Sequence, residues 1–463
     1  MTGTDCSVVV PNDYSGPVAI IGGSGSGKTE CVVKQTLYRT YRDGNFFAID
    51  LKGDLLSGYR EVNPGEVVKV FSLRGETEFT YEPFDFIRED GEDNLVSNMR
   101  ELVNALIPLP ANVRDPFWIQ SAREFLTGGL LYYYEKKPSF IEAVINIMTT
   151  PPTTLITIIG KCKNPMIRSF INNFLGDADL SDSKLLMGIS QEITNRLSVI
   201  VNDSRVRTAL SPSANQIQWT DLEICNIFLS VPEDRLEQYS PVIAMLNTQL
   251  VRSLERRHEK HSNEGRKQRQ ILVMLDEFPR LGRMDVIASA VSTLRSKNVV
   301  ICLVFQSLAQ LDAVYGRDVG RIILDNCSYM AVLSVNDVQS QKYFSERAGT
   351  HLVERRSRST SYAPPTESST VSDLLSRNAY KATGYTESVS VAREHLIQPH
   401  EFATQKDIIL FTPSGHTRVK KAPFHEIDRI TKFRDGVKKV IAEVKSFFSS
   451  CFGLIKRRVM GCS

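Results

Sequence analysis

The stretch Gly22-Gly23-Ser24-Gly25-Ser26-Gly27-Lys28-Thr29 lies between an apolar run, residues 17–21, and a helical pattern that extends from Glu30 to about Tyr41. It matches the phosphate-binding P-loop, G-x-x-x-x-G-K-T, in the expected context of a strand before and a helix after. The glycines let successive backbone N–H groups converge on phosphates, while Lys28 supplies a charge and Thr29 offers a hydroxyl to Mg²⁺. The alternative, a Gly/Ser turn that binds nothing, is disfavoured by the eight fitting positions and their context. We therefore predict that residues 22–29 bind a nucleotide.

Strands alternate with helices around this loop and again later in the chain. Further buried strands are indicated by apolar runs at 46–51, 67–71, 227–231, 271–275, 299–305, 329–334 and 408–411. Such alternation predicts an α/β fold with a mainly parallel central sheet that is covered on both faces.

The pattern changes between residues 94 and 204, where helical periodicity dominates and strand signals are sparse. We predict an all-α domain here, inserted into a nucleotide-binding domain made of residues 1–93 and 205–430. Residues 355–391 are rich in Ser, Thr and charged side chains and contain Pro364-Pro365. This composition predicts a long, flexible surface loop.

Residues 431–463 form a basic tail. From Lys432 to Arg458, eight Lys and Arg residues minus two acidic residues give a charge of +6, and apolar residues recur at helical spacing. This pattern predicts a basic amphipathic helix. The helix either docks on its own domain with a solvated basic face or contacts an anionic membrane surface or a partner protein.

The composition is that of an ordinary folded protein, with 42% hydrophobic and 24% charged residues among 463. It argues against a disordered, collagen-like or disulfide-stapled chain. A formal net charge of +3 neither demands nor excludes nucleic acid. Because the first residues are polar and no window holds about 20 apolar residues, we predict neither a signal peptide nor a membrane-spanning helix, and a cytoplasmic location.

The apolar run Ile271–Leu275 ends in Asp276 and Glu277, which is the form of a Walker B motif. We expect this strand to lie beside the P-loop strand, so that both ends meet at the nucleotide. Asp276 would hold Mg²⁺ through water, and Glu277 would orient and activate the attacking water. By itself, an apolar strand followed by two acidic residues is usually only a strand that ends in solvent. Because this chain also has a P-loop, nucleotide hydrolysis is the better interpretation of the pair. The acidic pair, without a following NKxD-like run, also separates the chain from switch-type GTPases.

Two further residues flank the strand 299–305. Gln306 follows it and can sense the terminal phosphate or position water, although a plain turn residue is equally compatible with the pattern. Arg295 precedes it, after a predicted helix at 286–294. In ring-shaped P-loop motors an arginine there can reach the neighbouring subunit's nucleotide. The alternative is an exposed arginine at a helix end.

These motifs resemble those of the TraG/TraD-type coupling proteins of type IV secretion and conjugation, which belong with the FtsK-like and HerA-like P-loop ATPases. The resemblance covers about residues 15–425. Besides the P-loop, it rests on Asp50-Leu51-Lys52-Gly53-Asp54, Asp115-Pro116-Phe117-Trp118 with Ala122-Arg123, Leu275–Gly282, and Gln306–Leu311 with Tyr315-Gly316. The extension Phe278–Gly282 is the most specific part, because generic ATPases lack it.

The resemblance implies a RecA-like P-loop NTPase domain that carries the all-α domain, and a homo-hexameric ring with ATP and Mg²⁺ between subunits. It assigns catalytic roles to Lys28, Glu277, Gln306 and Arg295, and metal binding to Thr29 and Asp276. Trp118 would lie on a substrate-facing helix or, as a lone Trp on an apolar face more often does, in the core.

The implied function is to recruit DNA with its bound relaxase, or protein effectors, and pump them to a secretion channel. Two alternatives remain, a low-turnover receptor for protein effectors and a DNA pump of chromosome segregation. Relatives usually carry two N-terminal membrane helices, whereas this chain starts some twenty residues before the P-loop. It is therefore either a membrane-free variant or a truncated form. We expect it at the inner face of the membrane, held by a membrane partner protein or by the basic tail.

Overall fold

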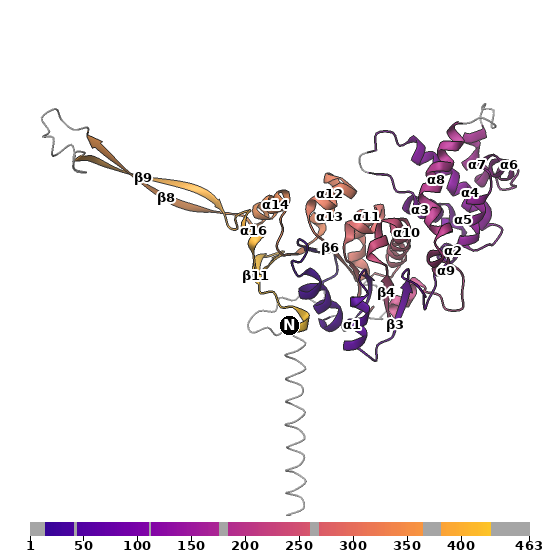
Figure 1. Cartoon of the computed structure of the whole chain (residues 1–463), viewed down its shortest axis with the longest axis horizontal. Coiled ribbons are helices and arrows are strands. Elements are labelled where there is room, and N and C mark those ends of the chain that lie inside the picture. The colour runs from indigo at the N-terminus through magenta and orange to yellow at the C-terminus, as the bar shows by residue number, and fades with distance from the viewer. Residues whose placement is uncertain are drawn as a thin grey trace, which may run out of the picture. The chain divides into compact units, whose positions relative to one another are not determined.

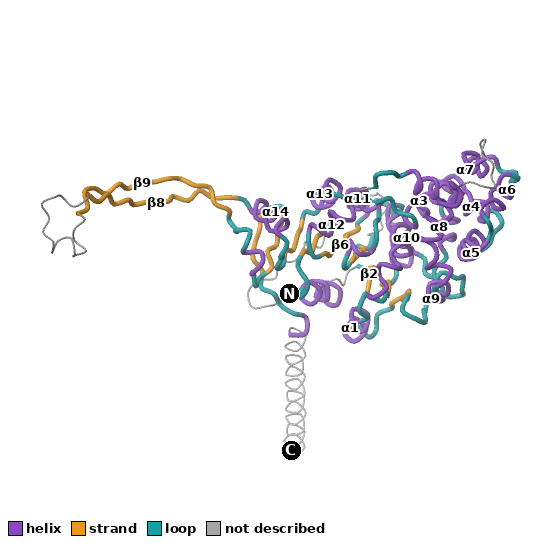
Figure 2. Tube along the Cα trace, turned by 45° about the horizontal axis from the view of Figure 1, so that its top comes forward, coloured by secondary structure: helices purple, strands orange, loops and turns teal. Residues whose placement is uncertain are grey.

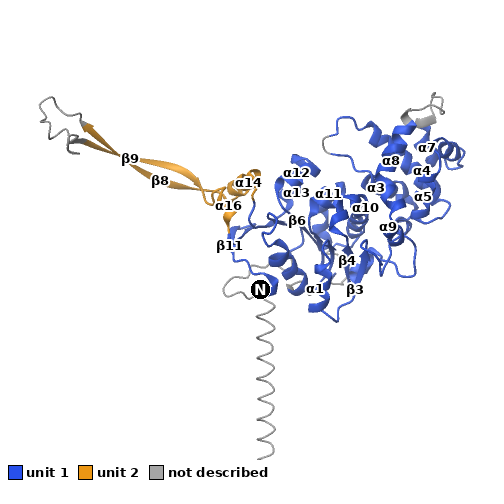
Figure 3. Cartoon of the chain, viewed as in Figure 1, with its two compact units in different colours: residues 1–335, 406–463 blue, residues 336–405 orange. Residues whose placement is uncertain are grey.

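The computed structural model describes residues 14–40, 44–110, 113–175, 184–259, 268–363 and 381–426. The chain divides into two compact units (Figure 3). Unit 1 comprises Met1–Val335 and Lys406–Ser463, and unit 2 comprises Asn336–Gln405. The predicted basic tail, 431–463, lies outside the described residues.

Unit 1 is built on a sheet of nine described strands in the order β11-β10-β7-β1-β6-β5-β2-β4-β3. Strands are orange in Figure 2, where β2 and β6 of this sheet are labelled. The bounds of these strands are β1 Val18–Ile21, β2 Asn45–Asp50, β3 Val68–Ser72, β4 Asn226–Ser230, β5 Ile271–Leu275, β6 Val299–Phe305, β7 Tyr329–Val332, β10 Ile408–Thr412 and β11 Gly415–Val419. All neighbours from β7 to β3 pair in parallel, and only the pairings of β10, with β7 and with β11, are antiparallel. The predicted α/β fold with a mainly parallel sheet is confirmed.

The order of the central strands corrects one expectation. The P-loop strand β1 pairs with β6 and β7, and β6 pairs in turn with β5, so the Walker B strand does not lie beside the P-loop strand. Chain order does not fix strand order, and the later strand β6 inserts between the two. Since all three strands run parallel, their carboxyl ends still share one edge of the sheet.

Helices cover both faces of the sheet. Successive residues of a strand point to opposite faces, and in the central strands both sets of side chains are buried. Phe46 packs edge-on against Tyr59 of α1 (Asp54–Val62), whereas Phe47 packs against Trp219 on the other face. Further helices of this unit are two π-helical turns, Thr29–Val33 and Thr36–Thr40, α2 Pro83–Glu89, α10 Leu236–Glu255, α11 Asp285–Thr293, α12 Leu308–Tyr315 and α13 Arg317–Asn326. The core strands β2, β4, β5 and β6 are buried along their whole length.

A group of helices lies between β3 and β4 in the chain, although the two strands are paired in the sheet. Figure 1 shows these helices together, beside the sheet. Its members are α3 Leu95–Leu106, α4 Phe117–Tyr134, α5 Phe140–Thr149, α6 Pro152–Gly160, α7 Pro165–Leu175, α8 Lys184–Asn202 and α9 Ser204–Ala209. The described residues between α3 and α9 contain no strand, as the periodicity predicted. These helices belong to the same compact unit as the sheet, so their status as a separate domain, 94–204, stays a prediction.

One helix pair of this group has the composition of a membrane segment. Within the described ranges, no single helix is long and apolar enough to cross a membrane. Taken together, helices α5 and α6 have the length and the apolar composition of a membrane-crossing segment, but the two helices are bent by 118° with respect to each other.

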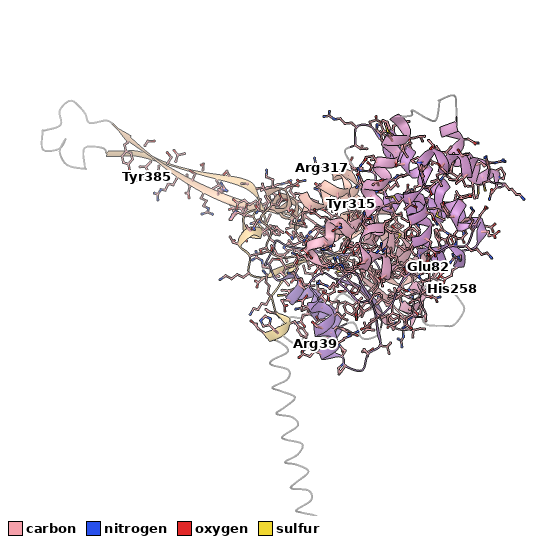
Figure 4. The ribbon with its side chains drawn as sticks, turned by 45° about the vertical axis from the view of Figure 1, so that its right-hand side comes forward. Arg39, Glu82, His258, Tyr315, Arg317 and Tyr385 are labelled. Carbon is pink, nitrogen blue, oxygen red and sulfur yellow. The ribbon has the colours of Figure 1, made fainter. Side chains whose placement is uncertain are left out.

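Unit 2 corrects the predicted flexible loop at 355–391 in its described parts, 355–363 and 381–391, which are strands. It contains α14 (Val338–Ala348), α16 (Glu401–Thr404) and a hairpin of β8 (Thr350–Ala363) with β9 (Lys381–His395), which pair antiparallel from end to end. Residues 364–380 lie outside the described ranges. Ser, Arg and Glu occupy many positions of the hairpin, so the alternation of apolar and polar side chains is weak in the sequence. The register of the two strands places Leu352, Val389 and Tyr385 on one face. Figure 4 shows Tyr385 on the hairpin. The continuous pairing satisfies the backbone that a loop would leave to water.

Candidate active site

The P-loop is fixed at its start by the strands on either side of β1. The Gly22 N–H donates to the Phe305 carbonyl (3.2 Å), and the Gly23 N–H donates to the Ser334 carbonyl (2.7 Å). A Cβ on Gly22 would lie 2.6 Å from Ser26 Oγ. Gly25 and Gly27 have φ values of 71° and 96°, which other residues rarely adopt. The glycines are thus required by the shape of the loop itself.

The loop encloses a buried cation and a buried hydroxyl. The Lys28 Nζ donates to the carbonyls of Gly22 (2.7 Å) and Gly23 (3.2 Å). Burial lowers the pKa of Lys28, and the charges of Glu277 and Asp276 oppose this shift. The Ser26 Oγ is buried and has no hydrogen-bond partner among the described residues. Backbone donors, an ammonium group and a free hydroxyl fit an anionic phosphate.

The two acidic residues follow β5 at the same edge of the sheet. The Glu277 N–H donates to Asp276 Oδ1 (2.9 Å), and Glu277 has a left-handed backbone with φ 51°. Burial, together with the charge of Glu277, raises the pKa of Asp276 to about 6, against the attraction of Lys28. Without a bound cation, ionising this carboxyl group costs free energy, and a bound cation would offset that cost. Mg²⁺ prefers oxygen ligands such as carboxylates. Strained backbone of this kind clusters at functional sites.

Gln306 contacts Glu277 directly. Its Nε2 donates to both carboxylate oxygens of Glu277, at 3.2 and 3.1 Å. The backbone N–H of Gln306 donates to Gln310 Oε1 (3.2 Å), so a residue of α12 holds the backbone from which the Gln306 side chain extends. Because β6 lies between β1 and β5, Gln306 lies between the P-loop and the acidic pair. Sequence reasoning missed this contact with Glu277, although the insertion of β6 makes it possible.

The extension after the acidic pair holds the strained turn in place. Phe278 begins the 3₁₀ turn Phe278–Leu281, is fully buried, and stacks on Tyr315 with ring centroids 5.3 Å apart. Gly282 has φ 99°, and a Cβ there would lie 3.0 Å from the Ser240 carbonyl. The residues of this extension therefore support Glu277 by packing. Tyr315 belongs to the family motif Gln306–Leu311 with Tyr315-Gly316, but the sequence did not predict that its ring stacks on Phe278.

Arg295 lies away from these residues. It is exposed and belongs to the turn Leu294–Lys297, which leads into the amino end of β6, whereas Gln306 follows the carboxyl end. Two other arginines follow the acidic pair in the chain, and both are paired: Arg280 with Glu233 (3.5 Å) and Arg283 with Asp285 (2.6 Å). Within one chain, then, Lys28, Asp276, Glu277 and Gln306 come together and Arg295 does not.

Trp118 is not a core residue in this structure. Its side chain is 41% exposed, beside the exposed ring of Phe117. One face covers Gly188 of α8, where an added Cβ would lie 2.6 Å from the indole. It is thus partly packed and partly open to solvent.

Comparison with known families gives a match over nearly the whole chain. A family model described as type IV secretory system conjugative DNA transfer matches residues 12–447. Protein VirD4 of Rhizobium rhizogenes is 25% identical over 352 residues, 74% of this chain and 51% of that protein. The conjugal transfer protein TraG of Escherichia coli is 20% identical over 342 residues, 67% of this chain and 52% of that protein. The chain spans about half the length of these curated relatives.

Solved structures of similar fold come from the plasmid coupling protein TrwB. Its complex with ADP and Mg²⁺ has a TM-score of 0.63 and 16% identity, over 89% of this chain and 85% of that one. Its complex with the GTP analogue GDPNP has a TM-score of 0.62 and 17% identity, over 89% and 86%. At such identities the likeness establishes the fold alone, which this chain shares with TrwB over 89% of its length.

Proposed function

This chain belongs to the type IV secretory system conjugative DNA transfer family, and from this premise we propose that it is a coupling ATPase. It hydrolyses ATP and moves DNA with its bound relaxase, or protein substrates, to a type IV secretion channel. The observation that carries the proposal is the meeting of Lys28, the Asp276–Glu277 pair and Gln306 at one edge of the sheet. The ADP and Mg²⁺ bound to TrwB support the choice of ligand.

Each residue of the site has a role in this proposal. The N–H groups of residues 22–29 hold the phosphates, and the Lys28 ammonium leaves its carbonyl partners to neutralise the outer phosphates. Thr29 and Asp276 would hold Mg²⁺, which supplies charge neutralisation on the phosphate oxygens. Glu277 accepts a proton from the attacking water, while the Gln306 amide fixes the orientation of its carboxylate.

We also propose a ring of six chains in which Arg295 serves the neighbour's nucleotide. Its exposure, and its distance along β6 from Gln306, favour a role in another subunit's site over a role in the site of its own chain. Arg295→Ala should bind ATP normally as a single chain but lose most hydrolysis in assembled rings. Unchanged turnover by verified rings would remove Arg295 from the site, and Arg280→Ala and Arg283→Ala would then be tested.

The proposal is tested by the steady-state ATPase rate at low salt, with and without added DNA, with Lys28→Ala as the blank. A motor that contacts DNA phosphates should be stimulated by DNA of any sequence, and the stimulation should fade as salt rises. Turnover above the blank that ignores DNA would favour a receptor for protein effectors. Turnover no higher than the Lys28→Ala blank would refute the ATPase. The location at the inner face of the membrane, through a partner or the tail, remains a prediction.

A further inference from the structure

The turn after β2 is held by a fully buried carboxylate. Asp50 has no exposed surface, and its side chain accepts three backbone N–H groups: Oδ1 from Lys52 (3.3 Å) and Gly53 (2.7 Å), and Oδ2 from Leu56 (3.0 Å). Gly53 has φ 83°, the left-handed backbone that glycine tolerates. These contacts fix the path of the chain from β2 into α1 without using the side chain of Lys52.

A second clamp holds the same turn from the neighbouring strands. The Arg74 guanidinium, which follows β3, donates to the Leu51 carbonyl through Nη2 and to Ser230 Oγ at the end of β4 through Nε (3.0 Å). The turn is therefore tied to the carboxyl ends of three parallel strands. Such an anchor is typical of a loop that must present a group in a fixed place.

Lys52 is the group that this turn presents. Its side chain is exposed and makes no hydrogen bond or ion pair with any described residue. Strand β2 pairs in parallel with β5, so Lys52 follows β2 at the edge where Asp276 and Glu277 follow β5. Adjacent strands are about 4.8 Å apart, and an extended lysine side chain reaches farther than that. The charge of Lys52 already favours the ionised form of Asp276.

The strand order places the acidic pair between two lysines. Lys28 follows β1, Asp276 and Glu277 follow β5, and Lys52 follows β2 on the far side. We propose that Lys52 is a second cation of the nucleotide site and contacts the terminal phosphate of a nucleoside triphosphate from the side opposite Lys28. This inference rests on the proposed function and adds to it a residue that distinguishes triphosphate from diphosphate.

The test measures the affinity of the whole chain for a non-hydrolysable ATP analogue and for ADP, each with Mg²⁺. Lys52→Met should weaken binding of the triphosphate about ten- to a hundredfold, the usual cost of a lost charged contact. ADP binding should change less than about threefold, because ADP lacks the terminal phosphate. Lys52→Arg should recover part of the loss. The control is Lys161→Met, which removes an exposed lysine after α6, remote in the chain, and should change neither affinity.

Two results would overturn the inference. One is equal weakening of ATP-analogue and ADP binding by Lys52→Met, which would mean a general effect of charge or of the turn. The other is no weakening while Lys28→Ala abolishes binding, which would leave the nucleotide site intact without Lys52. If Lys28→Ala binds both nucleotides as well as the wild-type chain, the proposed function itself fails, and the inference fails with it.

Discussion

Removing the charge of Asp276 should make the nucleotide-free protein more stable. The buried carboxyl has a folded pKa of about 6, against an ordinary value of 3.8. A difference of about two units corresponds to about 3 kcal/mol, at 1.36 kcal/mol per unit, spent on ionising it inside the protein. Asp276→Asn loses the attraction to Lys28 but keeps an oxygen for the Glu277 N–H. The net gain should therefore be about 1–3 kcal/mol at pH 7.5.

The sign of the pH dependence follows from the raised pKa. Between about pH 4 and pH 6 the folded wild-type chain binds more protons than the unfolded one, so its stability falls as pH rises through this window. The advantage of Asp276→Asn should accordingly be full above pH 6.5, fall to about a third by pH 4.5 and approach zero below about pH 4.

Urea unfolding of both proteins, without nucleotide, at several pH values between 4.5 and 7.5 measures this difference. Asp325→Asn, which changes an exposed carboxylate, is the control and should shift stability by no more than about 0.5 kcal/mol. A variant that is less stable than the wild type at pH 7.5 would refute the reasoning. So would a gain of the same size at every pH.

Two other predictions concern Gln306, which contacts Glu277 in the site, and Glu82, which contacts the backbone of the helical insertion at Phe140. Gln306→Ala frees the Glu277 carboxylate, so the rate constant of hydrolysis should fall about ten- to a hundredfold while nucleotide affinity changes little; a large loss of affinity with an unchanged rate would contradict this. Glu82 accepts the N–H groups of Phe84 and Phe140 (both 3.0 Å), and burial raises its pKa to about 7. The raised pKa lowers the free energy of unfolding of the wild-type chain progressively as pH rises from about 4.5 to 7. Glu82→Gln should therefore be about 1–3 kcal/mol more stable than the wild type at pH 8, and only slightly more stable at pH 5. Urea unfolding at the two pH values checks this, and a loss at pH 8 would disprove it.

The sequence predicted those parts of the site that depend on short stretches of chain. The P-loop, its flanking strand and helix, and the acidic pair after β5 are each local patterns, and the structure brings them to one edge. The position of β6 is different, because strand order depends on contacts between distant segments. The contact between Gln306 and Glu277 could not be predicted without that order.

Composition misled the prediction in unit 2. The Ser- and Arg-rich segment was expected to form a loop, since such residues rarely fill a core. In the hairpin, however, the strands pair with one another along their length, and exposed residues such as Leu352 and Tyr385 share one face. Likewise, nothing local indicates that Arg74 ties down the Leu51 carbonyl, because that contact joins the ends of different strands.

The measurement that tests the proposed chemistry most directly compares Glu277→Gln with the wild-type chain. Both ATP affinity and the rate of phosphate release are measured on the same preparations, under conditions in which rings form. Since Glu277 would accept the proton of the attacking water, the variant should bind ATP as tightly as the wild type and lose about a hundredfold or more in rate. Hydrolysis at the wild-type rate by Glu277→Gln would contradict the assignment of this site as the centre of an ATPase.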